Sequence, residues 1–201
     1  MSDQKYSVIV VDPPWAYGSQ TGRTRTAEHH YETIGNGGRE INRKTGAGIE
    51  GIIAATPIAE WAQKDAHLYL WTTNPKLPFA FEIMRAWGFE YKTTLTWVKT
   101  RADGGVSGGG MGWFYRGATE HVLFGVRGHK AIPSAVRRPN VVLAPTTEHS
   151  SKPVAFYDVL RSLYGEDEKM LDVYARRNHE RFTAWGFEAP EVEQPLQGEL
   201  I

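Results

Sequence analysis

The chain has 201 residues, of which 41% are hydrophobic and 23% are charged, and its formal net charge is zero. This length and composition predict one folded domain and argue against a disordered protein. The sequence contains no cysteine, which excludes disulfide bonds and thiolate metal sites. Because the N-terminus is polar and no apolar run reaches membrane-spanning length, we expect neither a signal peptide nor a membrane span, and we expect a cytoplasmic protein.

The first predicted element is a buried strand over residues 6–11, and it ends at the motif Asp12-Pro13-Pro14-Trp15. Ligands bind at the carboxyl ends of strands in open α/β sheets, so this motif is a candidate site. Proline has no N–H, so the carbonyls around the two prolines are expected to be free acceptors beside the Asp12 carboxylate. Such acceptors suit an amine with two hydrogens, and the Trp15 ring offers a base a face for stacking. The simpler alternative is a turn that only ends a strand.

A long polar segment, residues 17–48, is rich in Gly, Arg and Thr and predicts a functional or disordered loop. It contains two tyrosines, Tyr17 and Tyr31. The adjacent His29 and His30 have no second cluster at ligand spacing, so we expect no metal site. Basic residues in this loop and in residues 127–138 are either nucleic-acid contacts or an ordinary solvated surface.

Helices and strands then alternate along the chain, which predicts an α/β sheet. The predicted helices are 49–63 with an interruption at Pro57, 77–87 and 154–163, and the predicted strands are 66–71, 89–98, 119–127, 140–144 and 170–177. Gly88 should follow the end of the second helix, and Ser150 or Ser151 should cap the third. We expect residues 1–190 to form a single domain and residues 191–201 to form a flexible tail.

Further short motifs follow Asp12-Pro13-Pro14-Trp15 in a fixed order. They lie at 70–75, 87–91, 97–99, 112–113, 120–121, 126–128, 148–153 and 171–176. Each is weak alone, and core strands of any α/β protein could supply some of them. Together they resemble the Asp-Pro-Pro-Trp family of adenine N6-methyltransferases, which includes the catalytic subunit of the eukaryotic messenger-RNA adenosine methyltransferase and bacterial and phage relatives. The resemblance covers residues 7–188.

The resemblance implies a Rossmann-like class I methyltransferase fold in a permuted order, with the catalytic motif before the cofactor-binding region. It implies S-adenosylmethionine as the methyl donor and the N6 amine of adenine in nucleic acid as the acceptor, with DNA favoured over RNA by the small bacterial and phage members. The implied catalytic residues are Asp12, Pro13, Pro14 and Trp15. The implied substrate-binding residues are Tyr17, Tyr31, Trp71, Asn74, Lys99 and Glu120. The implied cofactor-binding residues are Asp12, Lys152, Asp172, Arg176, Asn178, His179 and Glu188, with Lys152 near the methionine carboxylate.

The chain departs from the family at Phe187, where related proteins usually carry an Asn that binds the cofactor ribose. The ribose would then be held elsewhere, for example by Glu188 or Asn178. A paired base cannot reach such a site, so the adenine must be single-stranded or flipped, with Trp15 and Tyr31 as stacking surfaces. A homodimer through residues 101–117 is expected to pool the nucleic-acid contacts of two chains.

Two other functions remain open from the sequence. A cytosine N4 methyltransferase is chemically close, although such enzymes resemble a Ser-Pro-Pro-aromatic pattern. A noncatalytic nucleic-acid-binding partner of the same fold is the other alternative, although such partners have lost the acid that Asp12 supplies here.

Overall fold

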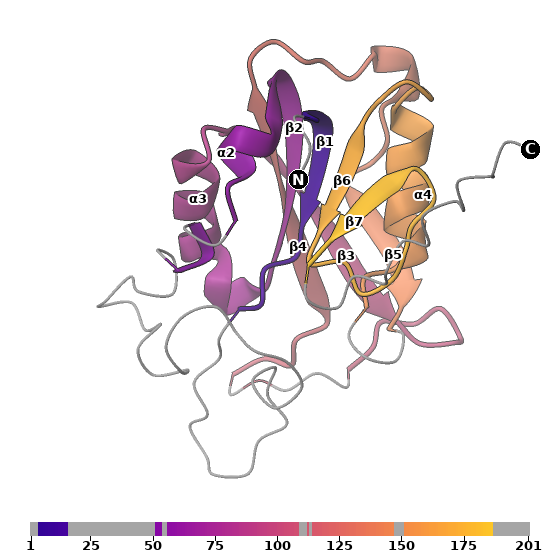
Figure 1. The fold of residues 1–201 in the computed structure, drawn as a ribbon. Coiled ribbons are helices and arrows are strands. Elements are labelled where there is room, and N and C mark those ends of the chain that lie inside the picture. The colour runs from indigo at the N-terminus through magenta and orange to yellow at the C-terminus, as the bar shows by residue number, and fades with distance from the viewer. Residues whose placement is uncertain are drawn as a thin grey trace, which may run out of the picture.

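A mixed β-sheet with the strand order β5-β3-β4-β2-β1-β6-β7 runs through the molecule. The structure, a computed structural model, describes residues 4–15, 51–53, 56–108, 112, 114–146 and 151–186. The strands are β1 (Tyr6–Val11), β2 (Ala62–Thr72), β3 (Glu90–Thr100), β4 (Thr119–Arg127), β5 (Val141–Pro145), β6 (Met170–Val173) and β7 (Phe182–Trp185). Only β4 is antiparallel to its neighbours among the strands of the described ranges, so the other strands direct their carboxyl ends to one edge (Figure 1).

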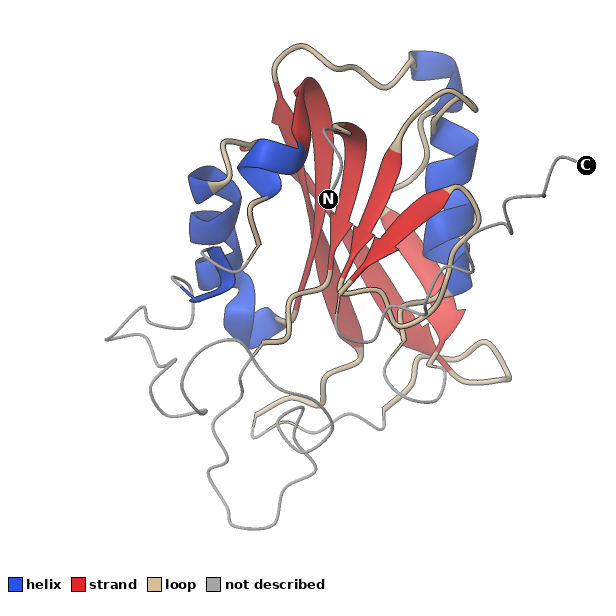
Figure 2. Cartoon of the chain, in the orientation of Figure 1, coloured by secondary structure: helices blue, strands red, loops and turns tan. Residues whose placement is uncertain are grey.

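Helices cover both faces of the sheet, as Figure 2 shows. The helices α2 (Ile58–Trp61) and α3 (Leu77–Ala86) lie on one face, and α4 (Val154–Leu163) lies on the other. The chain also forms two short 3-10 turns, η2 (Asn74–Lys76) and η3 (Ser134–Val136), and residues 51–53 are helical. This mixed α/β arrangement is compatible with the Rossmann-like methyltransferase fold that the sequence predicts.

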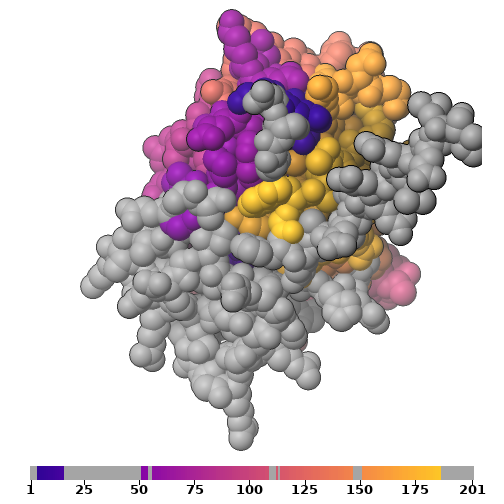
Figure 3. All heavy atoms as spheres, viewed as in Figure 1, coloured from indigo at the N-terminus to yellow at the C-terminus, as the bar shows by residue number. Residues whose placement is uncertain are grey.

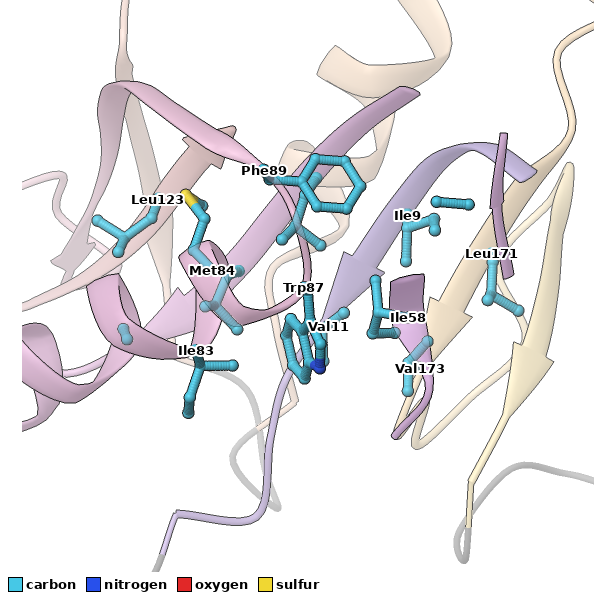
Figure 4. Close-up of a cluster of buried hydrophobic side chains, with 14 of the residues drawn as sticks. Ile9, Val11, Ile58, Ile83, Met84, Trp87, Phe89, Leu123, Leu171 and Val173 are labelled. Carbon is cyan, nitrogen blue, oxygen red and sulfur yellow. The ribbon is translucent and has the colours of Figure 1, made fainter. Parts of the chain in front are cut away.

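Strand β1 is buried on both faces, which explains its unbroken apolar sequence. Ile9 and Val11 point into the cluster beneath α3, whereas Val8 and Val10 point into the cluster beneath α4. Figure 4 shows the first of these clusters, with the indole of Trp87 close to Val11. Each fully buried side chain of this size contributes roughly 1.5–3 kcal/mol, so both clusters hold β1, and the turn that follows it, in place.

Several predicted elements are confirmed. Strands β1 and β4 and helix α4 occupy the expected residues, and helix α3 begins where the pattern placed it. Gly88 has φ +81°, and its N–H donates to the carbonyl of Arg85, as expected of a glycine that ends a helix. Strand β3 extends to Thr100, two residues past its predicted end, so Lys99 belongs to the strand.

Some predicted boundaries are wrong. The helical pattern was extended to Gln63, but β2 begins at Ala62 because Ala62 pairs with Tyr6 of β1. The last clear strand was extended to Arg177, but β6 ends at Val173 because Tyr174 adopts a left-handed conformation with φ 64°. Strand β7 has no counterpart among the predicted strands. The predicted loop 17–48 and the predicted tail lie outside the described residues.

Aromatic contacts hold strand β7, which belongs to the yellow, C-terminal part of the described chain that reaches the surface in Figure 3. The rings of Trp61 in α2 and Trp185 in β7 meet edge to face at 4.8 Å, and Tyr174 contacts Trp185 at 5.6 Å. Gly186 has φ +138°, and a Cβ there would lie 2.7 Å from the Tyr174 Cα. Only glycine therefore allows the chain to pass this close to Tyr174. No helix in the described ranges is long and apolar enough to cross a membrane.

A buried polar network lies at the opposite edge of the sheet from the carboxyl ends. His67 is 1% exposed, and its Nε2 lies 3.1 Å from the carbonyl oxygen of Lys130. A carbonyl can only accept, so Nε2 carries the proton, and Nδ1 accepts from the Tyr164 hydroxyl at 2.6 Å. The Tyr69 hydroxyl then donates to Tyr164 at 2.7 Å. Burial lowers the pKa of His67 from 6.5 to about 4, so the ring is neutral at pH 7 and this order of donors applies.

This network predicts a loss of stability in acid. The unfolded chain binds a proton at His67 near pH 6.5 and the folded chain only near pH 4, so folding stability falls as the pH drops through that window. The difference corresponds to at most about 3 kcal/mol, at about 1.4 kcal/mol for each pH unit. His67→Gln keeps one donor and one acceptor without titrating. Urea unfolding at pH 7, 5 and 4 should show a shallower pH dependence for this variant, and equal slopes would contradict the assignment.

Candidate functional site

Strand register brings the predicted polar residues to one edge of the sheet. Asp12 directly follows β1, and its N–H donates to the Val173 carbonyl of β6 at 3.2 Å. Lys99 lies near the carboxyl end of β3. Glu120 lies at the start of β4, which reaches the same edge because β4 is antiparallel to β2 and β3. Lys152 precedes α4.

Four of these side chains form a continuous row of alternating charge, which we call the charge chain: Asp12, Lys152, Glu120 and Lys99. The ammonium of Lys152 lies 2.9 Å from Asp12 Oδ2 and 3.2 Å from Glu120 Oε2. The ammonium of Lys99 lies 2.7 Å from Glu120 Oε1. The two acids and two bases cancel, so the site holds charged groups without net charge. The ammonium of Lys152 also lies 5.2 Å from the centre of the Trp71 ring, within the range of a cation–π contact.

The ion pairs of the charge chain influence the protonation states of Asp12, Glu120 and Lys152. Burial raises the pKa of Asp12, and the Lys152 ammonium opposes this rise. Burial raises the pKa of Glu120 as well, but Lys152 and Lys99 outweigh burial and leave its pKa below the usual value. Burial lowers the pKa of Lys152, but Asp12 and Glu120 outweigh it and raise the pKa above the usual value. Lys152 is therefore a permanent cation, and the charge on Asp12 depends on it.

The Asp12-Pro13-Pro14-Trp15 turn is tightly held. The N–H of Trp15 donates to the Pro13 carbonyl at 2.7 Å, and the Trp15 indole donates to the Trp71 carbonyl at 3.1 Å. The prediction that the Pro13 carbonyl lacks a local donor is therefore wrong, because the turn folds the Trp15 N–H back onto it. One lone pair of that carbonyl remains for another donor. Asp12 is the only partly exposed member of the motif, with 17% of its side-chain surface accessible.

The two tryptophans expected near a base are parts of the core. Trp15 is 5% exposed and Trp71 is 1% exposed, and they belong to the clusters on opposite faces of the sheet. Trp71 contacts the rings of Trp97 and Phe156 edge to face at 6.1 and 4.9 Å. Of the two rings, that of Trp71 contacts the Lys152 ammonium. Direct stacking of a base on Trp15, and substrate binding by Trp71, stay predictions.

A narrow pocket lies beside Asp12, between the ends of β1 and β6 and the start of α4. It encloses about 10 Å³, enough for one small polar group. It is lined by Asp12, Ser151, Lys152, Tyr157, Asp172, Tyr174, Ala175, Arg176, Arg177 and His179. The pocket thus gathers Lys152, Asp172, Arg176 and His179 from the predicted cofactor-binding set.

Asp172 is the unsatisfied group of this pocket. Its side chain is buried and hydrogen-bonded to Tyr157, but its Oδ2 finds no hydrogen-bond partner among the described residues. Burial is the main cause that raises the pKa of Asp172 to about 8, and the nearby Asp12 acts in the same direction. A buried acceptor without a donor is costly, so this oxygen is suited to a cationic donor from a ligand.

The other predicted residues are distributed around these groups. His179 stacks on Tyr157, with ring centres 3.4 Å apart and planes 10° apart. Burial lowers the pKa of His179 to about 4, and the neighbouring Arg177 acts in the same direction. Asn178 is exposed and does not line the pocket. Asn74 is exposed on η2, and its Oδ1 accepts from His121 Nε2 at 2.6 Å.

Part of the predicted site cannot be placed. Tyr17, Tyr31 and Glu188 lie outside the described residues, as does Phe187. In the described part of the chain, no group of three or more His, Cys, Asp or Glu residues is arranged to hold a metal ion.

The sequence analysis missed several side chains that line the pocket. Ser151 was expected to cap α4, but α4 has no side-chain cap, and the Ser151 hydroxyl accepts from Arg177 at 2.6 Å. Tyr157 has the pattern of a core residue in an amphipathic helix, so only its hydrogen bond to Asp172 distinguishes it. The pairing of these residues depends on how α4 packs on β6, which no local motif encodes.

Comparison with known proteins places the chain among methyltransferases. It is 28% identical to a type II methyltransferase, M.MunI, from Mycoplasma sp, over 98% of this chain and 84% of that protein. It is 26% identical to the N(6)-adenosine-methyltransferase catalytic subunit METTL3 of Homo sapiens, over 79% of this chain but only 24% of that protein. A third relative, the N6-methyladenosine RNA methyltransferase MTA1 of Cryphonectria parasitica, is 26% identical over 94% of this chain and 53% of its own length.

The match to a family model covers most of the chain and contains the whole site described above. The model is that of the family MT-A70, and it matches residues 6–188. This range begins with β1, includes the charge chain and the pocket, and ends after β7. The chain therefore belongs to the MT-A70 family.

Proposed function

We propose that this chain transfers a methyl group from S-adenosylmethionine to the exocyclic N6 amine of adenine in DNA. The observation that carries the proposal is the Asp12 carboxylate, held by Lys152 at the carboxyl edge of the sheet beside a pocket with an unsatisfied acid. The predicted enzyme class, an adenine-N6 methyltransferase, is confirmed by the family match and by the named relatives. The choice of DNA rests on the small bacterial members of the family, one of which matches this chain along most of its length.

The residues at the pocket fit the amino-acid end of the proposed donor. An ammonium group is a cationic donor that suits the free oxygen of Asp172, and a carboxylate suits two arginines that line the pocket, Arg176 and Arg177. S-adenosylmethionine supplies a methyl group activated by a positively charged sulfur. Since residues of β6 would hold it and Asp12 follows β1, we propose the permuted order in which the catalytic motif comes first.

Asp12 is proposed to activate the amine. The lone pair of an adenine amine is delocalised into the ring, so the amine is a poor nucleophile until its N–H bonds are held out of the ring plane. The Asp12 carboxylate accepts one N–H, and the remaining lone pair of the Pro13 carbonyl accepts the other. As positive charge develops on the nitrogen, the fixed carboxylate stabilises it in a site largely shielded from water. A base held in this way must be flipped or single-stranded.

Lys152 is proposed to keep Asp12 ionised. Two of its three ammonium hydrogens are directed at Asp12 and Glu120, and Lys99 balances the second acid. Without the Lys152 ammonium, burial alone would favour a protonated Asp12, which would lose one acceptor. This role adds to the expected position of Lys152 near the methionine carboxylate, since its third hydrogen is still available to an anion.

The first test concerns Asp12 itself. Asp12→Asn keeps the shape of the side chain but removes the charge, so methyl transfer should fall by about 100- to 1,000-fold, as for other single groups that stabilise developing charge. Asp158→Asn, which removes an exposed carboxylate on α4, is the matched control. Radiolabelled donor should be offered with adenine-only and cytosine-only DNA and with the equivalent RNA. Transfer to cytosine, or to RNA alone, would contradict the proposed substrate, and an Asn variant within a few-fold of wild type would contradict the role of Asp12.

The second test concerns Lys152. Lys152→Met should raise the pKa of Asp12 further, so the acidic limb of the kcat/KM profile should move to higher pH. Activity lost at pH 7 should be partly recovered at pH 9, whereas a merely structural loss would lower the profile at every pH. Lys152→Arg should restore most of the wild-type profile. Lys130→Met, which breaks an ion pair with Glu168 at the other edge of the sheet, is the control.

The third test concerns Asp172 and needs no turnover. With a pKa of about 8, this group is mostly protonated at pH 7, so a cationic donor that binds its carboxylate should release close to one proton. Calorimetry of S-adenosylmethionine binding in two buffers of different ionisation enthalpy measures that release. Asp172→Asn should bind more weakly and should release no such proton. Proton release that persists in the variant would remove Asp172 from the donor site.

A further inference from the structure

Two adjacent aromatic side chains project from the connection between β3 and β4. Phe114 is 95% exposed and Tyr115 is 91% exposed, far more than any other large hydrophobic side chain in the described part of the chain. Neither ring has a contact in the core, so neither contributes to packing. Water solvates such rings poorly, and adjacent exposed rings usually mark a surface that binds a partner.

The two rings lie at the same edge of the sheet as the charge chain. The connection leaves the carboxyl end of β3 and enters the start of β4, where His121 pairs with Thr72 at the end of β2. Tyr115 is five residues before Glu120, so the two Cα atoms are at most about 18 Å apart. Figure 1 shows the segment before β4 at the same end of the sheet as the turn that follows β1.

Close contacts define the shape of this connection. A Cβ on Gly112 would lie 1.8 Å from the Tyr115 carbonyl oxygen, so only glycine fits at this position. Nearer to β3, Arg101 donates to Asp103 at 2.9 Å and to the Val106 carbonyl at 3.1 Å, which closes the first half of the connection on itself. The polar groups there satisfy one another, while the rings beyond them stay exposed.

We propose that Phe114 and Tyr115 are a stacking platform for the bases next to the target adenine, in a single-stranded or locally opened stretch of DNA. This rests on the proposed function. An adenine that leaves the stack deprives its neighbours of a stacking partner, and an exposed aromatic ring replaces it at about 1–3 kcal/mol for each base. Arg116, exposed beside Tyr115, adds a positive charge for the backbone.

The balanced charge of the chain favours stacking on DNA bases over contacts to DNA phosphates. Proteins that hold nucleic acid through phosphate contacts usually carry a basic excess, but this chain has 23 basic and 23 acidic residues. Two of the lysines at the site, Lys99 and Lys152, are neutralised by Glu120 and Asp12. Stacking depends little on charge, so it supplies affinity that the balanced surface does not.

The test separates stacking from phosphate contact. Binding of a fluorescent single-stranded DNA with one central adenine is compared with binding of the same strand carrying abasic sites on both sides of that adenine. Phe114→Ala/Tyr115→Ala should weaken binding of the intact strand by about tenfold for each ring but should change binding of the abasic strand less than twofold. The slope of log affinity against log salt should be unchanged. Tyr91→Ala, at the opposite end of β3, removes an aromatic ring outside the site and should bind both strands as wild type does.

Methyl transfer then distinguishes the two proposals. The double variant should have a raised KM for the intact strand and a kcat within a few-fold of wild type. The platform alone would be overturned if the wild type methylates DNA and the double variant binds the intact strand as tightly as the wild type does. A wild type that methylates no nucleic acid would overturn the proposed function. The two rings could instead bind a second copy of the chain, and light scattering tests this. If the wild type is a dimer, the double variant is a monomer and the DNA affinity of each chain is unchanged, the platform is also overturned.

Discussion

The Lys152 ammonium, shared between the carboxylates of Asp12 and Glu120, is the interaction on which the rest of the site depends. Charges this poorly hydrated are costly to hold, and they persist only when each has a partner of opposite sign. Removing any one member leaves an uncompensated charge next to the position proposed for the reacting amine. The surrounding core, with Trp71 beneath the ammonium and the Trp15 indole tied to the Trp71 carbonyl, limits how far these groups can move.

The sheet topology makes this arrangement possible. Asp12 follows β1 and Lys152 precedes α4, so both lie at the carboxyl edge of the sheet, as expected in an α/β fold. Glu120, however, is at the start of its strand, and the start of a parallel strand would lie at the other edge. Because β4 is antiparallel to β2 and β3, its first residues, including Glu120, lie at the carboxyl edge of those strands. The same reversal places the connection before β4 beside the site. One change of strand direction therefore supplies both the second acid of the charge chain and the exposed aromatic pair.

Much of the fold could be predicted from the sequence because its strands and helices carry strong local patterns. The β-branched run before Asp12, the amphipathic pattern of α4 and the glycine after α3 each encode their element within a few residues. Strand β7 was missed because four residues carry too little periodicity, and β6 was extended too far because a left-handed tyrosine has no sequence signature.

The candidate site was predicted as a set of residues but not as a set of contacts. The motif order identified Asp12, Lys99, Glu120 and Lys152, yet their pairing depends on the register of strands far apart in the chain. The hydrogen bond from Trp15 to the Pro13 carbonyl depends on backbone angles within the turn. The unsatisfied oxygen of Asp172 depends on what α4 places opposite it, which only the packed structure reveals.

The connection between β3 and β4 begins and ends at the same edge of the sheet, because the two strands are antiparallel neighbours. The length of this connection can therefore change without shifting the pairing of β3 with β4. Doubling a flexible loop costs only about 0.6 kcal/mol of closure free energy, so insertions there would leave Asp12 and its partners undisturbed. A lineage could exchange the proposed stacking platform for another surface that contacts flanking bases while the chemistry stays constant. The fold thus separates the evolution of recognition from the evolution of catalysis.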